Sequence, residues 1–372
     1  MKICHLAVTH NVLSDSRIME KMACSNSELG HDTCVITAGL KSQNYKGVEI
    51  ISISSSKLPR KFYILTMLKC FYAAMKAKAD IYHIHEVPLM LLGVVLVLLG
   101  KKVVVDFHED FEAELLGKKY LNKVLIGFFV LLYQPFKFLI LPRFHHIILA
   151  EDGYIKNFNS MLGNVSIVRN YPITEMIRFS EVFGKNKLRV LYLGTITEDR
   201  GCINLIDAVS HLKREAKFDI SLELIGPIHD SCLKMLVQNR IANAGGFITW
   251  KGAMPYDLVV KEITNYDVGF AALHDDPNYR ESLPTKLLEY NAAGLFSIVS
   301  NLPISHRYVT DDLNALIVEP DDTDSVIAAL EKIWDEKLYQ NRKVISELMA
   351  AKYSWSSQLL ILNKCYFKVL GR

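Results

Sequence analysis

Two glutamates eight positions apart, Glu281 and Glu289, stand in the stretch ESLPTKLLEYNAAG. Because Pro284 disfavours helix at the residue before it, we expect Glu281 in a loop and Glu289 inside a helix that Thr285 caps and Gly294 ends. The two carboxylates can then converge on one ligand, and Glu289 can accept both hydroxyls of a ribose diol. The alternative is a surface loop followed by an amphipathic helix with a solvated glutamate.

The residues around this stretch favour an anion as the ligand. Lys286 lies in the first helical turn, where the helix dipole disfavours a cation, so an anion is expected to hold it. In LYLGTITEDRG (191–201), Gly194 follows a predicted strand and Arg200 stands beside the start of a helix. Free N–H groups, the positive end of the dipole and a guanidinium suit an anion. Taken alone, a tight turn with a solvated arginine is the simpler explanation of 191–201.

Histidines and carboxylates end two predicted strands of the first half. They lie in DIYHIHEVPL (80–89) and VVVDFHEDF (103–111) and are His83, His85, Asp106, His108 and Glu109. These residue types suit acceptor binding, acid–base work or a metal ion. Alternation along a strand places both histidines of H-x-H on one face without any metal, so metal is the least favoured reading.

Composition and charge bound the class of protein. The 372 residues are half hydrophobic and 22% charged, which predicts a large core and excludes wholesale disorder. The seven cysteines are scattered and form no C-x-x-C pair, which indicates reduced thiols in a cytoplasmic protein. Residues 1–180 carry 21 Lys+Arg against 15 Asp+Glu, net +6, and the remainder carries 22 against 25, net −3. This asymmetry fits two domains with different partners, or ordinary scatter.

Short apolar runs alternate with helical patterns along the whole chain, which predicts parallel sheets covered on both faces. We expect strands near 2–8, 33–38, 48–53, 80–85, 102–106, 145–149, 165–168, 188–193, 219–225, 247–250, 267–272, 296–299 and 315–318. The segment 170–187 lacks clean periodicity and precedes a fresh strand, so the domain boundary is expected there. Two such open α/β domains would leave a cleft at the carboxyl ends of their sheets.

Two hydrophobic stretches bear on membranes. Residues 87–100 are too few to span a bilayer and predict a helix buried between strands. Residues 121–144 are long enough, but Gln134, Pro135 and Lys137 interrupt them, and aromatic and basic residues crowd and flank them. The region 118–144 therefore suits either a helix pair lying in an anionic membrane interface or a core helix pair.

The second half resembles a known family. The motif is Glu281, seven residues and Glu289, followed by EYNAAG and SIVSNLP. The supporting pieces are Gly194 with Arg200-Gly201, LELIGP ending at Gly226, and WKGAMPYDL around Met254. Together they resemble the nucleotide-sugar half of GT-B glycosyltransferases, family 4, of the bacterial surface-polysaccharide type, and the likeness covers almost the whole chain.

The resemblance implies roles for the donor residues. Glu289 would bind the ribose, Glu281 the donor sugar, and Arg200 with Lys286 the diphosphate. The family often has an arginine where this chain has Thr195, so one cationic contact is missing there. The other donor-binding positions that the resemblance implies are Gly194, Gly226, Met254 near the base, and Thr285.

The resemblance also implies roles in the first half. His108 maps to a histidine that contacts the donor sugar, and Asp106 and Glu109 would position acceptor hydroxyls. The D-x-R-I run in THNVLSDSRIMEK resembles a family opening, which makes three further residues acceptor candidates: His10, Asp15 and Arg17. An Asp-capped helix start explains that run equally well.

The resemblance predicts two Rossmann-like doubly wound α/β domains, 1–175 for the acceptor and 186–352 for the nucleotide sugar, with a helix in 353–372 returning to the first domain. Asp322 and Asp324 have the D-x-D spacing of metal-dependent sugar transferases, but they open a helix after Pro320, so capping explains them better. We therefore expect no cofactor and no essential metal.

The predicted function is retaining transfer of a sugar from a nucleotide diphosphate, UDP above all, to a hydroxyl of a lipid-linked saccharide or growing surface polysaccharide. His108, Arg200, Lys286 and Glu281 would be the catalytic residues. The alternatives are a nucleotide-sugar epimerase of the same fold, a silent binding scaffold, and a metal hydrolase built on the histidine cluster. No nucleic-acid partner is expected, and the protein is expected in the cytoplasm or peripherally at the inner face of its membrane.

Overall fold

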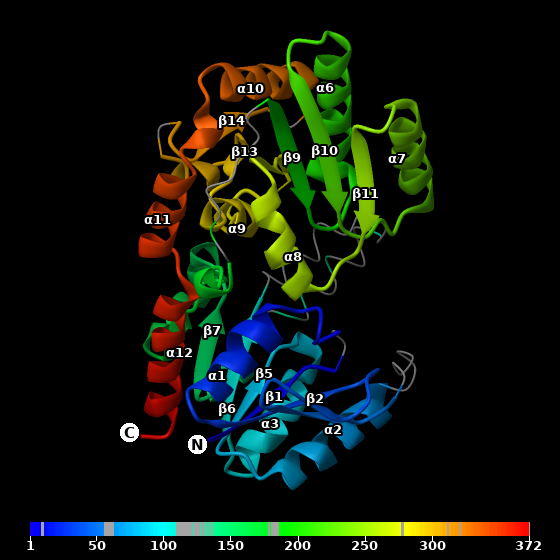
Figure 1. Cartoon of the computed structure of the whole chain (residues 1–372). Helices are drawn as coiled ribbons and strands as arrows, with labels where there is room; N and C mark the ends of the chain where they lie inside the picture. The colour runs from blue at the N-terminus through cyan, green and yellow to red at the C-terminus, as the bar shows by residue number, and fades with distance from the viewer. Residues whose placement is uncertain are drawn as a thin grey trace. The chain divides into compact units, whose positions relative to one another are not determined.

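The computed structural model describes most of the chain as two compact units (Figure 1). Unit 1 is Met1–Asn170 with Trp355–Arg372, and unit 2 is Tyr171–Ser354. The residues outside the description are 9–10, 56–62, 109–121, 123–126, 128–130, 132, 134, 136, 178, 180–185, 277–278, 311, 320 and 372, and the side chains of 157 and 159–162.

Unit 1 is built on an eight-stranded sheet in the order β3-β4-β2-β1-β5-β6-β7-β8. Every pairing is parallel except that of β3 with β4. Its central strands are buried almost throughout and mostly apolar because both faces of the sheet are covered. The strands are β1 (Lys2–Leu6), β2 (Asp32–Thr37), β3 (Gln43–Tyr45), β4 (Val48–Ser52), β5 (Ile81–Ile84), β6 (Lys102–Phe107), β7 (His146–Leu149) and β8 (Val165–Ile167).

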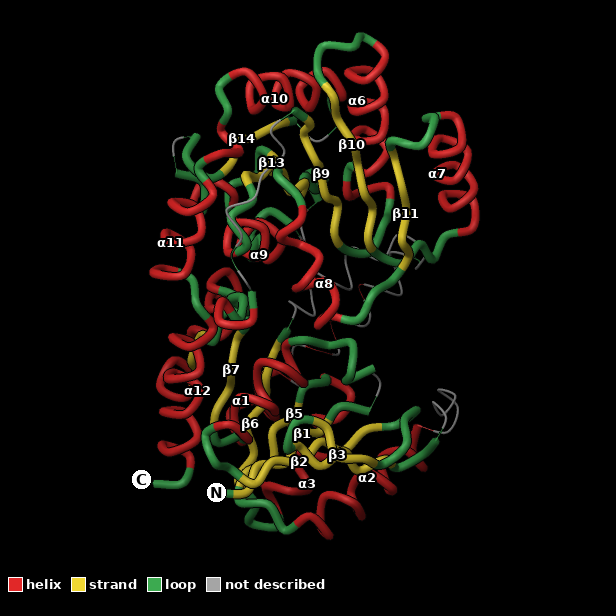
Figure 2. The backbone as a smooth tube through the Cα atoms, viewed as in Figure 1, coloured by secondary structure: helices red, strands yellow, loops and turns green. Residues whose placement is uncertain are grey.

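Helices cover both faces of this sheet (Figure 2). The helix α2 packs on β1 and β2, and α3 packs on β5 and β6, so these two are neighbours on one face. The π-helix η1, continued by α1, packs on alternate residues of the strands, and α12 contacts η1 and β8. The helices are η1 (Arg17–Cys24), α1 (Ser25–Glu28), α2 (Tyr63–Ala77), α3 (Met90–Leu98) and α12 (Trp355–Val369).

Unit 2 has a six-stranded parallel sheet in the order β11-β10-β9-β12-β13-β14. The order reverses between β9 and β12, and ligands bind at the carboxyl ends of strands at such a switch point. The strands are β9 (Lys187–Leu193), β10 (Asp219–Ile225), β11 (Ile248–Gly252), β12 (Val268–Ala271), β13 (Phe296–Ser300) and β14 (Ala315–Val318). The helices are α6 (Cys202–Arg214), α7 (Ser231–Asn243), α8 (Tyr256–Glu262), α9 (Thr285–Ala292), α10 (Thr323–Asp335) and α11 (Arg342–Lys352).

Segments of 3-10 helix join these elements, and each is three residues long except η5. They are η3 (Val87–Leu89), η4 (Leu141–Arg143), η5 (Asp152–Asn164), η6 (Thr174–Met176), η7 (Glu198–Arg200), η8 (Ile263–Asn265), η9 (Ser305–Arg307) and η10 (Leu338–Gln340).

The expected fold class, two doubly wound α/β units, is confirmed, and each expected strand is present. The sequence reading missed β3, which pairs antiparallel with β4 through a two-residue turn. Lys46 and Gly47 form this turn with φ of 47° and 81°. Positive φ at both positions matches the right-handed twist of a hairpin, but a lysine there carries almost no turn signal.

The two hydrophobic stretches have different outcomes. In 87–100, α3 is buried on its inner side only, so the expectation of a fully buried helix is wrong. Most of 118–144 lies outside the described residues, and the interfacial hypothesis for it stays a prediction. Within the described part of the chain, no helix is long and apolar enough to cross a membrane.

The helix α12 is tied into unit 1 by a buried tryptophan. The Trp355 side chain is 2% exposed, and its Nε1 donates to Ser25 Oγ at 3.0 Å. Truncating Trp355 to alanine should therefore destabilise unit 1 by about 3–5 kcal/mol. Urea unfolding should show this loss, whereas Phe367→Ala on the same helix, where the side chain is 41% exposed, should cost much less. Equal losses in both variants would contradict the role given to Trp355.

Candidate functional site

Two glycines let the ends of β9 and β10 come together in unit 2. A Cβ built on Gly226 would lie 1.8 Å from the carbonyl oxygen of Gly194, which no side chain tolerates. Both glycines have positive φ, 135° for Gly194 and 150° for Gly226. The chain therefore presents bare backbone at the switch point of the sheet, where a ligand can approach closely.

Arg200 and Lys286 both reach this bare backbone. A Cβ built on Gly194 would lie 3.8 Å from Arg200 Nη1 and 3.8 Å from Lys286 Cε. The Nε of Arg200 is buried and has no hydrogen-bond partner among the residues that the structure describes. Two cationic side chains, one with an unsatisfied donor, thus surround a glycine turn, which is the chemistry of an anion site.

Lys286 is held by Glu289, one turn further along α9. Its Nζ lies 2.6 Å from Glu289 Oε2, and Glu289 is only 7% exposed. The anion that the sequence reading sought for Lys286 is thus supplied, in this structure, by the chain itself. Thr285 does not cap the helix as expected. It is the first helical residue, Pro284 occupies the cap position, and no side chain there makes a cap hydrogen bond.

Glu281 lies in a loop, as expected, but it faces a different partner. Its Oε2 is 3.6 Å from Arg307 Nη2, and both side chains are about half exposed. The ion pair is thus well solvated and weak, so it leaves Glu281 available to another ligand at small cost.

Asp199 and Tyr279 complete the surroundings of Arg200 and were missed by the sequence reading. Tyr279 Oη donates to Asp199 Oδ2 at 2.5 Å. Burial alone would raise the pKa of Asp199, but hydrogen bonds to its carboxylate outweigh burial and hold the pKa below its usual value. Asp199 directly precedes Arg200 in the sequence, and that adjacency was the only available signal.

The structure also gives the contacts of Thr195, Met254 and the two aspartates of the D-x-D motif. The backbone oxygen of Thr195 accepts a hydrogen bond from Tyr192 Oη at 3.1 Å. Met254 is half-buried and packs against the apolar cluster between α8 and the sheet. Asp322 caps α10 by accepting from the Asp324 N–H at 2.9 Å, so the capping explanation of D-x-D is confirmed.

A buried carboxylate organises the expected acceptor residues of unit 1. Asp106, at the end of β6, accepts from Arg17 Nη2 at 2.7 Å and from Arg17 Nε at 3.1 Å. Arg17 Nη1 also donates to the Val168 carbonyl at 3.0 Å. The Asp106 side chain is fully buried and that of Arg17 is 4% exposed. The two side chains thus hold the polar edge of unit 1 from within, and their expected contact with an acceptor stays a prediction.

His108 lies on the accessible side of Asp106. Its Nε2 is 2.7 Å from Asp106 Oδ2, and its side chain is 18% exposed. Burial alone would raise the pKa of Asp106, but Arg17 and His108 outweigh it and hold the pKa well below its usual range. Asp106 therefore stays ionised and fixes the orientation of the His108 ring.

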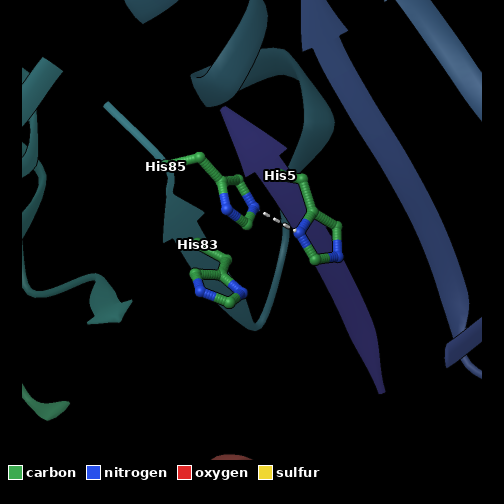
Figure 3. Close-up of side chains that lie close together, drawn as sticks. All are labelled: His5, His83 and His85. Carbon is green, nitrogen blue, oxygen red and sulfur yellow. Dashed lines mark hydrogen bonds between the residues drawn. The ribbon is translucent and has the colours of Figure 1, made fainter. Parts of the chain in front are cut away.

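Three further histidines, His5, His83 and His85, lie close together (Figure 3). His5 and His83 are register partners on β1 and β5, and His85 follows on the same face. His85 Nε2 is 2.8 Å from His5 Nδ1, and His85 Nδ1 is 3.4 Å from Asp106 Oδ2. His83 Nδ1 is 2.7 Å from Tyr366 Oη of α12. The sequence reading missed His5, which the register of two parallel strands would have placed.

Two groups here have metal-ligating residue types: His5, His83 and His85, and His85, Asp106 and His108. In the first, the 2.8 Å contact of His5 and His85 is an ordinary hydrogen-bond distance. In the second, Arg17 and His108 already engage the carboxylate. The buried Nε2 atoms of His5 and His83 have no hydrogen-bond partner among the described residues, so the absence of a metal stays a prediction.

Two loop expectations end differently. Asp15 Oδ1 accepts from the N–H groups of Arg17 at 3.0 Å and Ile18 at 3.1 Å, so the helix-start explanation of Asp15 is confirmed. His10 and Glu109 lie outside the described residues.

Known proteins resemble this chain in its fold and, over part of its length, in its sequence family. Residues 173–348 match the family Glycosyl transferases group 1. No curated protein matches the chain. Among solved structures, the chain is similar to sucrose-phosphate synthase from Thermosynechococcus elongatus, with 15% identity, a TM-score of 0.76 and coverage of 100% of this chain and 99% of that one. It is similar to Anabaena Alr3699/HepE in complex with UDP and glucose, with 10% identity, a TM-score of 0.74 and coverage of 99% and 100%. It is also similar to the lipopolysaccharide outer core galactosyltransferase WaaB in its apo form, with 15% identity, a TM-score of 0.61 and coverage of 99% and 99%.

Two doubly wound units with these structural relatives define the GT-B fold. Within this fold, residues 173–348, somewhat less than half of the chain, are similar to the glycosyl transferases group 1.

Burial of the histidine cluster makes unit 1 sensitive to acid. Burial lowers the pKa of His85 to about 4, lowers that of His146 to about 4, and lowers those of His5 and His83 well below the usual value. In the unfolded chain these side chains bind protons below about pH 6.5, so acid favours unfolding.

We therefore expect the free energy of unfolding to fall between pH 7.5 and pH 5.5, by roughly 1.4 kcal/mol per buried histidine for each pH unit below about 6.5. Urea unfolding at the two pH values measures this. The variant His83→Gln should show a shallower decline, by about one histidine. Equal unfolding free energies at the two pH values would contradict the buried neutral cluster.

Proposed function

We propose that the chain is a retaining family 4 glycosyltransferase that moves a sugar from a nucleotide diphosphate sugar to a hydroxyl acceptor. The observation that carries this proposal is the group formed by Gly194, Arg200, Lys286 and Glu289 at the switch point of unit 2. It joins two cations to bare backbone and to a carboxylate on a helix, which matches a diphosphate beside a ribose.

The ion pair of Lys286 with Glu289 suggests how the donor is received. In the donor's absence each side chain neutralises the other at 2.6 Å. A diphosphate would take over Lys286 and release Glu289, which could then accept the ribose hydroxyls. Donor binding thus exchanges one ion pair for another, and no charge is left buried without a partner.

Charge develops on the leaving diphosphate as the sugar bond breaks. Arg200 and Lys286 would stabilise it, and fixed cations of this kind supply a large part of catalysis because they need no reorganisation. We propose Glu281 and His108 as contacts of the donor sugar. Asp106 orients His108 through the 2.7 Å contact, while Arg17 keeps Asp106 ionised. No metal or other cofactor enters this mechanism.

The donor and acceptor classes rest on weaker support. HepE was solved with UDP and glucose, and WaaB is named as a galactosyltransferase of the lipopolysaccharide outer core. We therefore propose UDP as the carrier and a lipid-linked saccharide or growing surface polysaccharide, at the inner face of the cytoplasmic membrane, as the acceptor. The contrasting candidate, an epimerase, would convert donor without any acceptor.

A binding screen tests the donor half. We expect one nucleoside diphosphate, UDP first, to raise the melting temperature, because ligand at about 100 times its dissociation constant stabilises a protein by roughly 2.7 kcal/mol. GDP, ADP, TDP and CMP are the comparison set. The variant Glu289→Ala should lose the shift, and the exposed control Glu215→Ala on the far end of α6 should keep it. No shift with any nucleotide, for folded protein, would refute the donor site.

Turnover tests the role of Arg200. Replacing Arg200 with alanine should raise the reaction barrier by about 2.7–4 kcal/mol and lower turnover by about 10²–10³-fold. The variant lacks a cation that stabilises the negative charge on the leaving diphosphate. Sugar transfer from the donor found in the screen is the measurement. Arg214→Ala, an exposed arginine on α6, is the matched control and should leave turnover unchanged. Near-normal turnover of Arg200→Ala would overturn the assignment.

A further inference from the structure

Two neighbouring helices of unit 1 expose apolar side chains to solvent. On α2 the inner stripe of Thr66, Cys70 and Ala74 is buried against the sheet. The outer side carries large apolar residues instead, and α3 repeats the pattern. The exposed residues are Ile64, Leu65, Leu68 and Tyr72 on α2, and Leu91, Val95, Leu98 and Leu99 on α3 or at its end. We call these eight residues the α2–α3 face.

The α2–α3 face is one surface and not two isolated stripes. The helices cover the neighbouring strand pairs β1–β2 and β5–β6, and their buried sides belong to a single apolar cluster (Figure 1). On each helix the exposed residues recur at the three- and four-residue spacing of one helical side. Five of the eight are strongly exposed, between 54% and 77%: Ile64, Leu68, Tyr72, Leu91 and Leu98.

The composition of α3 is typical of a buried helix and not of one that faces water. The α3 sequence MLLGVVLVL contains no polar side chain, and a helix that is apolar on all sides is normally buried. Exposed apolar patches of this kind mark contact with a protein or a membrane. Among the described residues, only the inner side of α3 is buried, so its outer side is available to a partner.

The charges around the face identify the partner. Lys69 and Lys76 are exposed on α2, and Lys101 and Lys102 follow α3. Neither helix contains an acidic residue, and between residues 57 and 102 the sequence has eight Lys+Arg against two Asp+Glu. A second copy of the chain would bring two basic rims together and be repelled. An anionic lipid surface attracts the rim and accepts the apolar side chains.

We propose that the α2–α3 face docks unit 1 onto an anionic lipid bilayer, with the apolar residues of both helices in the interface and the lysines at the headgroups. The residues of this face lie between 64 and 99 and are separate in the sequence from the region 118–144. Docking also needs no donor or acceptor, so its test is independent of the proposed transfer reaction.

Flotation with lipid vesicles tests the proposal on the full-length protein. We expect the wild type to bind vesicles of phosphatidylcholine mixed with phosphatidylglycerol, and to bind phosphatidylcholine alone far more weakly. The double variant Leu68→Glu/Leu98→Glu should lose at least about tenfold in partition coefficient, because two inserted side chains become charged. Both positions are exposed, so the variant should keep the melting temperature of the wild type.

The matched control is Met235→Glu/Leu360→Glu, which changes two residues of similar exposure, 61% and 67%, on α7 and α12. It should bind as the wild type does. Lys69→Gln and Lys76→Gln should each weaken binding to the anionic vesicles by about fivefold, as the loss of one juxtamembrane charge predicts.

Three results would overturn the proposal: no binding of the wild type to the anionic vesicles, unchanged binding of the Leu68/Leu98 variant, or an equal loss in the control. Sedimentation equilibrium tests the remaining alternative, a dimer formed through the α2–α3 face. A wild-type dimer that dissociates in the Leu68/Leu98 variant, together with no vesicle binding, would assign the face to a second copy of the chain.

Discussion

The polar edge of unit 1 depends on one buried ion pair. Asp106 sits at the end of a strand with no exposed side-chain surface, where an unpaired carboxylate would cost several kcal/mol. Arg17 offsets that cost with two hydrogen bonds to the carboxylate. Its Nη1 also donates to the Val168 carbonyl, directly after β8. The pair thus fixes η1, β6 and the end of β8 together, and the same carboxylate orients His108. The Asp106 carboxylate therefore serves both the packing of unit 1 and the proposed chemistry of His108.

Most of the fold could be predicted from the sequence because buried parallel strands are continuous apolar runs separated by helical patterns. The failures have physical reasons. The hairpin of β3 depends on Lys46 and Gly47, whose backbone twist is invisible to composition. The composition of α3 predicts burial, and a sequence cannot say whether the covering surface comes from its own fold or from elsewhere.

The site was predictable where residues are close in sequence and unpredictable where they are not. Helix spacing brings Lys286 and Glu289 together, and loop geometry places Glu281 outside that helix. Arg17 and Asp106 are 89 positions apart, so no local pattern could show that they bind each other. Nor could a local sequence pattern show that Tyr279 donates a hydrogen bond to Asp199.

Unit 2 is one uninterrupted segment, Tyr171–Ser354, whereas unit 1 is assembled from both sides of it. Synthesis of unit 1 consequently begins before that of unit 2 but is completed after it. Unit 2 has all its strands before α12 is made, and domains generally fold as units during translation. The first unit waits with the α12 side of its sheet uncovered until Trp355 and Tyr366 arrive to meet Ser25 and His83. A ribosome stalled between the two would carry a finished second half and an open first half, which is the state that a chaperone would meet.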